Sequence, residues 1–218
     1  MSSEPTPPQD AADEPIDAAE HARGLALERS RRLGQLDAMR NAGTNPYPYR
    51  FDRTHTLADI RSEFGALEAG TETEVHVEVA GRMLLKRDQG KLIFASLRDR
   101  DGDIQLFVSK AIVGDELFDA INALDLGDWV GVSGLVMTTR KGELSIKVNK
   151  LVLLAKAVRP LPDKWHGLTD PDTRYRQRYA DLISNDEARR AFAIRHAIIA
   201  SFRKTLSAKS FIEVETPV

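Results

Sequence analysis

Apolar side chains recur every three or four residues between Asp17 and Ala42, and this spacing predicts a helix. They share one stripe of that helix: Ala22, Leu25, Leu33, Leu36 and Met39. Gly43 is well placed to end the helix, because glycine readily adopts the left-handed backbone that follows many helices. Thr56, followed three residues later by Asp59, predicts the start of a second, short helix whose first N–H groups these two side chains satisfy.

From residue 73 the apolar period changes from three or four to two, as Val75, Val77 and Val79 show, and this alternation predicts a strand. Further strands are expected over 91–98, 103–109, 129–137 and 143–154, with a helix over 115–124. Asp101-Gly102 is typical of a hairpin turn between the second and third strands. Three strands, a helix and two strands form the order of an OB-fold, a five-stranded Greek-key barrel that binds oligonucleotides on its second and third strands.

Strand alternation assigns each side chain to the core or to the outer face of this barrel. In the third strand the apolar residues face the core, which leaves Gln105 and Phe107 outside. In the fifth strand the same rule places Glu143 and Ser145 outside. The second strand is apolar on both faces, so Phe94 is either an outward-facing ring or a core residue.

An outward-facing Phe94 completes a set of side chains suited to single-stranded RNA, because bases stack on exposed rings. The Gln105 amide both donates and accepts, and Arg87, expected in the loop between the first two strands, adds directional donors. Glu143 can accept from a base N–H. Residues 73–155 hold 11 basic and 12 acidic side chains, so binding would rest on stacking and base edges more than on phosphate charge.

The chain has 218 residues, of which 42% are hydrophobic and 29% charged, a balance typical of one large or two small globular domains. The absence of cysteine excludes a disulfide framework, cysteine zinc sites, iron–sulfur clusters and a thiol nucleophile. No apolar run approaches the roughly 20 residues that span a bilayer. The acidic, proline-rich N-terminus differs from a signal peptide, so a cytoplasmic protein with no membrane partner is expected.

The formal net charge of −2 is unevenly distributed along the chain. Residues 1–22 carry six acidic and no basic side chains, and residues 1–16 are expected to be a disordered acidic tail. The remaining residues hold 31 basic and 27 acidic side chains, a weak sign of a polyanionic partner. The arginines of the first helix either contact phosphates or form a solvated face: Arg23, Arg29, Arg31, Arg32 and Arg40.

Two prolines between Arg159 and Lys164 predict a stiff connector. The arginines and tyrosines of residues 174–179 suit either packing against a neighbouring domain or contact with an RNA backbone. A helix is expected over Asp186–Ala208, followed by an alternating strand from Phe211 to Pro217. One helix and one strand bury too little area to fold alone, so we expect the chain to be the front part of a longer protein.

Several segments resemble one enzyme family. RPLPDKWHGLTDPDTRYRQRYADLISN is similar to the domain junction of bacterial lysyl-tRNA synthetases, and FIEVETPV resembles the end of motif 1 of class II aminoacyl-tRNA synthetases. AGRMLLKRDQGKLIFASLRDRDGDIQLFV and KGELSIKV resemble the anticodon-binding OB domain of the same enzymes. The RYRQRY element is shared with aspartyl and asparaginyl relatives, whereas RPLPDKWHGL points to lysine.

The resemblance implies a lysine–tRNA ligase, which uses ATP and Mg²⁺ to attach lysine to tRNA-Lys. It implies that Phe94 stacks on an anticodon uracil, that Arg87 and Gln105 read base edges, and that Glu143 contacts a neighbouring anticodon base. The family is homodimeric, and the resemblance assigns four residues of motif 1 to the dimer interface: Phe202, Leu206, Phe211 and Pro217.

The motifs that bind ATP and lysine in this family, motifs 2 and 3, do not occur in the sequence. The chain is therefore expected to bind RNA without catalysing ligation, to contain no catalytic or metal-binding residue, and to bind neither ATP nor Mg²⁺ alone. Two alternatives stay open: a free-standing OB-fold protein that binds single-stranded nucleic acid, and a ligase paralogue that lysylates a protein or a lipid. The motif 1 segment argues against the first, and the retained barrel and the lack of membrane spans argue against the second.

The expected fold is α+β: an N-terminal helix, an OB-fold β-barrel, and the first helix and strand of a truncated class II catalytic domain. The expected boundaries are an acidic tail over 1–16, a helical region over 17–72, the barrel over 73–156, a junction over 157–184 and the start of the catalytic domain over 185–218.

Overall fold

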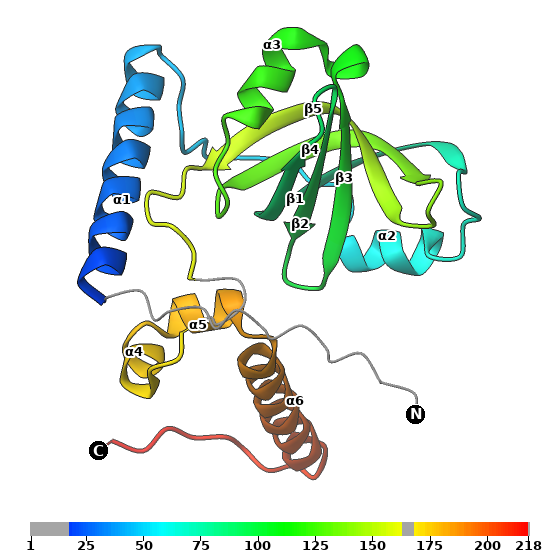
Figure 1. Cartoon of the computed structure of the whole chain (residues 1–218). Helices are drawn as coiled ribbons and strands as arrows, with labels where there is room; N and C mark the ends of the chain where they lie inside the picture. The colour runs from blue at the N-terminus through cyan, green and yellow to red at the C-terminus, as the bar shows by residue number, and fades with distance from the viewer. Residues whose placement is uncertain (1–17, 163–167, 218) are drawn as a thin grey trace, which may run out of the picture. The chain divides into compact units, whose positions relative to one another are not determined.

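The computed structural model describes residues 18–162 and 168–217 (Figure 1). The chain divides after Pro160 into two compact units. The predicted acidic tail, residues 1–16, lies outside the described residues, and so do residues 163–167 of the predicted junction.

The first unit contains a closed barrel with the strand order β1-β2-β3-β5-β4. Its strands are β1 (Glu72–Asp88), β2 (Leu92–Arg98), β3 (Asp103–Ser109), β4 (Trp129–Thr138) and β5 (Leu144–Ala155). Helix α3 (Lys110–Asn122) follows β3 in the chain, as predicted. A short parallel pairing of β3 with β5, from Gln105↔Ser145 to Phe107↔Lys147, closes the barrel, and every other pairing is antiparallel. The predicted OB-fold is confirmed.

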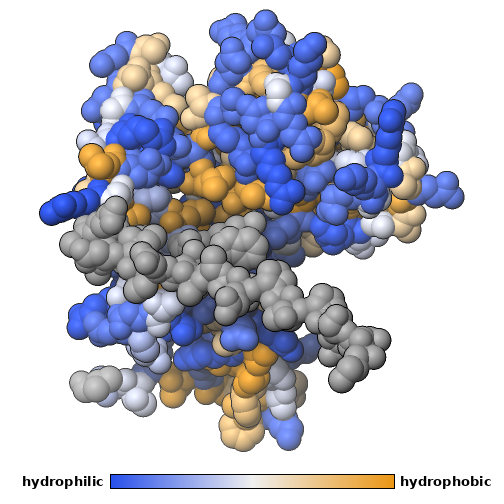
Figure 2. Space-filling view, viewed as in Figure 1, coloured by the Kyte–Doolittle hydropathy of each residue, from blue (hydrophilic) through white to orange (hydrophobic). Residues whose placement is uncertain are grey.

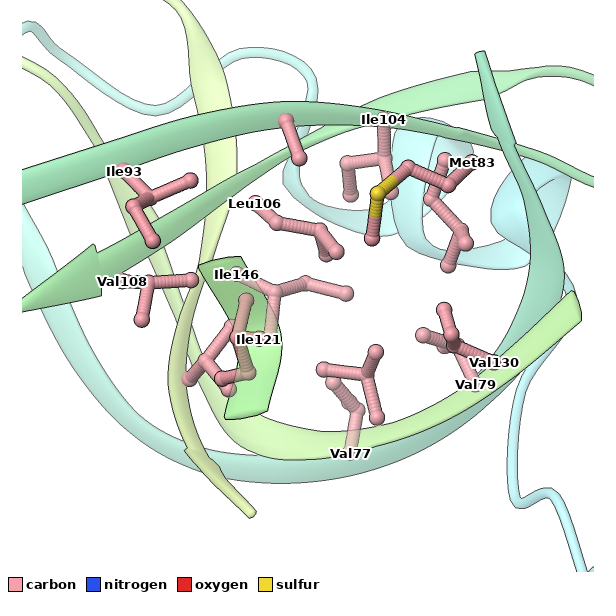
Figure 3. Packing of buried hydrophobic residues seen from close by; sticks show 14 of the residues in the cluster. Val77, Val79, Met83, Ile93, Ile104, Leu106, Val108, Ile121, Val130 and Ile146 are labelled. Atoms are coloured by element: carbon pink, nitrogen blue, oxygen red, sulfur yellow. The ribbon is translucent and has the colours of Figure 1, made fainter. Parts of the chain in front are cut away.

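Alternate residues of the strands fill the barrel interior, where their side chains point toward one another (Figure 3). Helices α3 and α2 (Leu57–Phe64) lie at opposite ends of the barrel (Figure 1). α3 contributes Phe118 and Ile121 to the core, and α2 contributes Leu57 and Ile60. The predicted capping box begins α2: the Asp59 N–H donates to Thr56 Oγ1 at 3.1 Å, and the Thr56 N–H donates to Asp59 Oδ2 at 2.9 Å.

Helix α1 (Ala18–Asn41) is held to the barrel mainly by charged groups. Of its predicted apolar stripe, Leu36 is buried, whereas Leu25 and Leu33 are exposed. Arg32 is only 5% exposed and donates to the carbonyl oxygens of Leu126 (3.0 Å) and Ala157 (3.1 Å). Both roles predicted for Arg32, a phosphate contact and a solvated surface residue, are therefore wrong, because the guanidinium satisfies carbonyls that only the folded chain brings together.

Arg32 belongs to a connected group of ion pairs, some within α1, some on the barrel side and some, such as Arg31–Asp125, joining the two, which we call the α1 ion cluster. Its members are Glu28, Arg31, Arg32, Asp125, Asp128 and Lys156. The fully buried Lys156 Nζ lies 2.8 Å from Asp128 Oδ2. Burial raises the pKa of Asp125, but hydrogen bonds from Lys156 and Arg31 outweigh it and hold that pKa below its usual value. The side chains of this cluster thus balance one another's charges.

The second unit consists of α4 (Pro171–Arg176), α5 (Arg178–Ser184) and α6 (Asp186–Ala208). Arg174 and Arg178 both donate to Asp181, which is 1% exposed. These two arginines therefore contribute to packing within this unit, whereas the two roles predicted for them, packing against a neighbouring domain and contact with an RNA backbone, stay predictions. α6 spans the predicted residues, and apolar side chains gather on its visible surface (Figure 2).

The strand predicted from Phe211 to Pro217 is wrong for this structure, in which residues 211–217 have no regular secondary structure. A strand requires a neighbour to accept and donate its backbone hydrogen bonds. In the described part of the chain, the strands all belong to the barrel, and none of them pairs with this segment. Phe211, Ile212 and Val214 are accordingly exposed.

Candidate nucleic-acid interface

The outer face of β2 and β3 carries the side chains that the sequence singled out. Ile93 and Ala95 face the core, and Phe94 between them is half-buried on the outer face. Gln105 and Phe107 lie on the same face of β3, since their neighbours Leu106 and Val108 are fully buried. Of the two orientations left open for Phe94, the structure has the outward one.

Phe94 pairs across the sheet with Phe107, and the two rings meet edge to face with centroids 5.5 Å apart and planes at 66°. On its other side Phe94 pairs with Arg87, which lies inside β1. The prediction of a loop position for Arg87 is wrong. Pairing with β2 extends β1 through Asp88, although the polar run Lys86-Arg87-Asp88 breaks the alternation on which the prediction relied.

Glu143 lies at the end of the β4–β5 turn, next to the first residue of β5. Two hydrogen bonds with Thr139 hold this turn: the Thr139 N–H donates to the Glu143 carbonyl at 2.9 Å, and the Glu143 N–H donates to Thr139 Oγ1 at 3.0 Å. Gly142 has a φ of 85°, a left-handed conformation that glycine adopts without strain. The backbone of Glu143 is therefore fixed beside β3, while its side chain is exposed.

Two hollows occupy this face, with volumes of about 760 and 140 Å³. All four residues predicted to bind nucleic acid line both of them: Arg87, Phe94, Gln105 and Glu143. We call the two hollows together the β2–β3 groove. The larger is within the size range of small-ligand sites, so it can hold a base with part of its sugar. The sequence predicted these four side chains as one set, and the structure brings them to the same groove.

The groove also contains residues that the predictions missed. Arg140 and Lys141 of the β4–β5 turn line the larger hollow, and Arg61 of α2 lines the smaller. Arg140 and Lys141 stand directly before the turn glycine Gly142, a local signal that could have marked them as loop residues of the binding face. Nothing local marks Arg61, because only the folded chain brings α2 to this face.

Charges in the larger hollow are mixed. Arg87, Arg140 and Lys141 line the hollow together with Glu72 and Glu143, and Glu72 forms an ion pair with Lys147 at 2.6 Å. The groove is therefore only mildly positive. Such a site suits stacking and hydrogen bonding to bases better than neutralisation of many phosphates.

The four residues predicted for a dimer interface lie in the second unit. Phe202 and Leu206 are exposed on α6, and Phe211 and Pro217 are exposed in the segment that follows it.

Across residues 18–162 and 168–217, the acidic and histidine side chains form no group of three or more that could hold a metal ion. No helix within these ranges combines the length and apolar character needed to cross a membrane.

Comparison with protein families gives two matches, the first to the barrel and the second to the second unit. The model of the OB-fold nucleic acid binding domain of the tRNA anticodon type matches residues 77–154, which cover the barrel. The model of class II tRNA synthetases (D, K and N) matches residues 170–218, which cover the second unit from the start of α4.

Individual relatives agree with the family models. The chain is 47% identical to a lysine–tRNA ligase of Enterococcus faecalis over 91% of this chain and 40% of the relative. It is 48% identical to that of Burkholderia pseudomallei over 99% of this chain and 41% of the relative. The chain thus spans about two fifths of the length of the curated relatives it matches. The resemblance of this chain to bacterial class II lysyl-tRNA synthetases is therefore confirmed.

Proposed function

We propose that this chain provides the anticodon-binding part of a lysine–tRNA ligase, and that the β2–β3 groove binds the anticodon loop of tRNA-Lys. One observation carries the proposal: an outward-facing ring, Phe94, shares a groove with Arg87, Gln105 and Glu143 on the nucleic-acid face of an OB barrel. The similarity to lysine–tRNA ligases supports the choice of RNA.

Phe94 provides the stacking surface for an unpaired anticodon base, proposed to be uracil. Stacking of a base on an aromatic side chain contributes about 1–3 kcal/mol and does not depend on which base it is. Base identity must therefore be read by polar groups beside the ring. Gln105 and Arg87 are placed to hydrogen-bond the edge of the stacked base, and Glu143 to accept from its neighbour.

The full ligation reaction is proposed for the complete ligase, in which ATP and Mg²⁺ serve lysine activation in the cytoplasm. These 218 residues by themselves are proposed to bind RNA and to leave lysine unactivated. No residue of this chain is proposed to be catalytic, because motifs 2 and 3, which bind ATP and lysine in lysine–tRNA ligases, do not occur in its sequence.

The exposed apolar residues of α6 and of residues 211–217 are proposed to be covered by a second copy of the chain. Phe202 is 66% and Phe211 63% exposed, values that are unfavourable for aromatic side chains left in water. Light scattering tests this: a monomer at micromolar concentration would argue against pairing through these 218 residues.

Titration of anticodon stem-loops tests the proposed function. The anticodon loop of tRNA-Lys should bind. Replacing its central uracil by cytosine should weaken binding by about tenfold or more, because cytosine exchanges the donor and the acceptor on the base edge that the groove reads. The alternative, a free-standing OB-fold protein for single strands, predicts equal titration curves for the two loops and comparable binding of a single-stranded DNA of the same sequence.

A further inference from the structure

Gln105 is held by a chain of hydrogen bonds that ends on the backbone. Its Nε2 donates to Ser145 Oγ at 3.0 Å, and Ser145 Oγ donates to the carbonyl oxygen of Glu143, also at 3.0 Å. Gln105 and Ser145 are direct partners in the β3–β5 pairing that closes the barrel. Ser145 was expected on the outer face, but its side chain is fully buried beneath the groove residues.

The Glu143 carbonyl determines the direction of both hydrogen bonds. A carbonyl oxygen can only accept, so the single proton of the Ser145 hydroxyl is committed to Glu143. The Glu143 carbonyl is itself held in place by the Thr139 N–H at 2.9 Å. Toward Gln105 the Ser145 oxygen can therefore present only a lone pair. If the Gln105 amide turned by 180°, two acceptor oxygens would face each other in a buried place, which is unfavourable.

We propose that Ser145 is a positioning residue that sets the base specificity of the groove by holding the Gln105 amide in one orientation. This inference rests on the proposed function and adds the residue that enforces its selectivity. With Nε2 bound to Ser145, the Gln105 carbonyl oxygen is turned away from Ser145 and is available to a ligand, together with the second Nε2 proton.

The proposed orientation distinguishes the two pyrimidines. The Watson–Crick edge of uracil offers an N3–H donor beside an O4 acceptor, and cytosine offers an N3 acceptor beside an N4–H donor. The two patterns are reversed copies of each other, and an amide that can turn over reads both. An amide held by Ser145 accepts from N3–H and donates to O4 of uracil. On cytosine the same orientation places the amide oxygen opposite the acceptor N3 and the amide N–H opposite the donor N4–H, so neither hydrogen bond forms.

Removing the hydroxyl tests this directly. In Ser145→Ala the amide is free to turn, so the ratio of dissociation constants for the cytosine and uracil loops should fall about tenfold, mainly through tighter cytosine binding. In a Gln105→Ala background, adding Ser145→Ala should leave the ratio unchanged, because Ser145 acts through Gln105. Circular dichroism melting of each variant checks that the barrel is folded.

A merely structural role for Ser145 gives a different pattern. Ser145→Ala would then weaken both loops by the same factor, or would change the ratio equally in the Gln105→Ala background. Either result overturns the proposal, and so does an unchanged ratio in Ser145→Ala alone.

A second measurement needs no RNA. In ¹⁵N spectra of the free chain, one Gln105 side-chain amide proton should exchange slowly because it is bonded to a buried hydroxyl, and Ser145→Ala should abolish this protection. An unprotected Gln105 amide overturns the proposal even if the chain prefers uracil. A protected amide in a chain with no preference for uracil would place the failure in the proposed function instead.

Discussion

Phe94 and Phe107 meet edge to face on the outer surface of the barrel, with ring centroids 5.5 Å apart. Such aromatic pairs contribute about 0.5–1.5 kcal/mol beyond the area they bury. The contact restricts the Phe94 ring before any ligand is present. A base that stacks on it therefore costs less ordering entropy than one that stacks on a freely rotating side chain.

Phe94→Ala should weaken binding of the lysine anticodon stem-loop by about 1–3 kcal/mol, because the stacking surface is lost. Phe107→Leu is the matched control, since it keeps apolar bulk and removes only the supporting ring edge, and its loss should stay below about 1.5 kcal/mol. Fluorescence anisotropy with a labelled stem-loop measures both. Equal affinities of Phe94→Ala and the unmodified chain would assign the ring to packing alone.

Lys156→Met should lower the free energy of unfolding by about 3–5 kcal/mol, because it leaves the buried Asp128 carboxylate without its cation. Lys150→Met, inside β5, is the control: Lys150 is exposed, and its substitution should change stability by at most about 0.5 kcal/mol. Urea titration followed by circular dichroism gives both values. Similar midpoints for the two variants would contradict a stabilising role for the α1 ion cluster.

Acid should weaken the α1 ion cluster. Hydrogen bonds from Arg31 and Arg32 lower the pKa of Glu28 from its usual 4.5 to about 2. Because the pKa is lower in the folded state, this stabilisation is complete above pH 4.5 and is lost as the pH falls from 4.5 toward 2. Asp125, whose pKa is also lowered, adds to the effect in the same direction.

The pH dependence of the melting temperature checks this prediction. Glu28→Gln should melt lower than the unmodified chain at pH 7, and the difference should shrink toward pH 2.5, because Glu28 of the unfolded chain is protonated over this range and unfolding thereby becomes easier. Glu63→Gln, at an exposed position of α2, serves as the control. A difference that stays constant between pH 7 and 2.5 would show that Glu28 contributes nothing through its charge.

The purified 218-residue chain should show no lysine-dependent exchange of pyrophosphate into ATP, because the motifs that hold ATP and lysine in this family do not occur in its sequence. A complete lysine–tRNA ligase assayed in parallel provides the positive control. Exchange above the level of a lysine-free reaction would refute the prediction and would require an ATP site in these residues.

Local patterns were sufficient to predict the barrel. The period-two alternation placed Leu106 and Val108 inside and Gln105 outside, because successive side chains of any strand point to opposite faces. The capping box of α2 was also predictable, since Thr56 and Asp59 lie within one helical turn. Alternation could not decide the orientation of Phe94, because both faces of its strand are apolar. It also did not predict that Arg87 lies in a strand, because β1 reaches that residue only through its pairing with β2.

The sequence by itself determined the order of the strands, the outward position of Gln105, and the family resemblance carried by residues 159–185 and 211–218. Only the tertiary structure decided that Arg32 is buried against two distant carbonyls and that Ser145 lies beneath Gln105 as its hydrogen-bond acceptor. The physical reason is distance along the chain. Alternation and capping act between neighbouring residues, whereas these contacts join groups 40 to 125 positions apart, which only the closed barrel and its docked helix bring within hydrogen-bonding range.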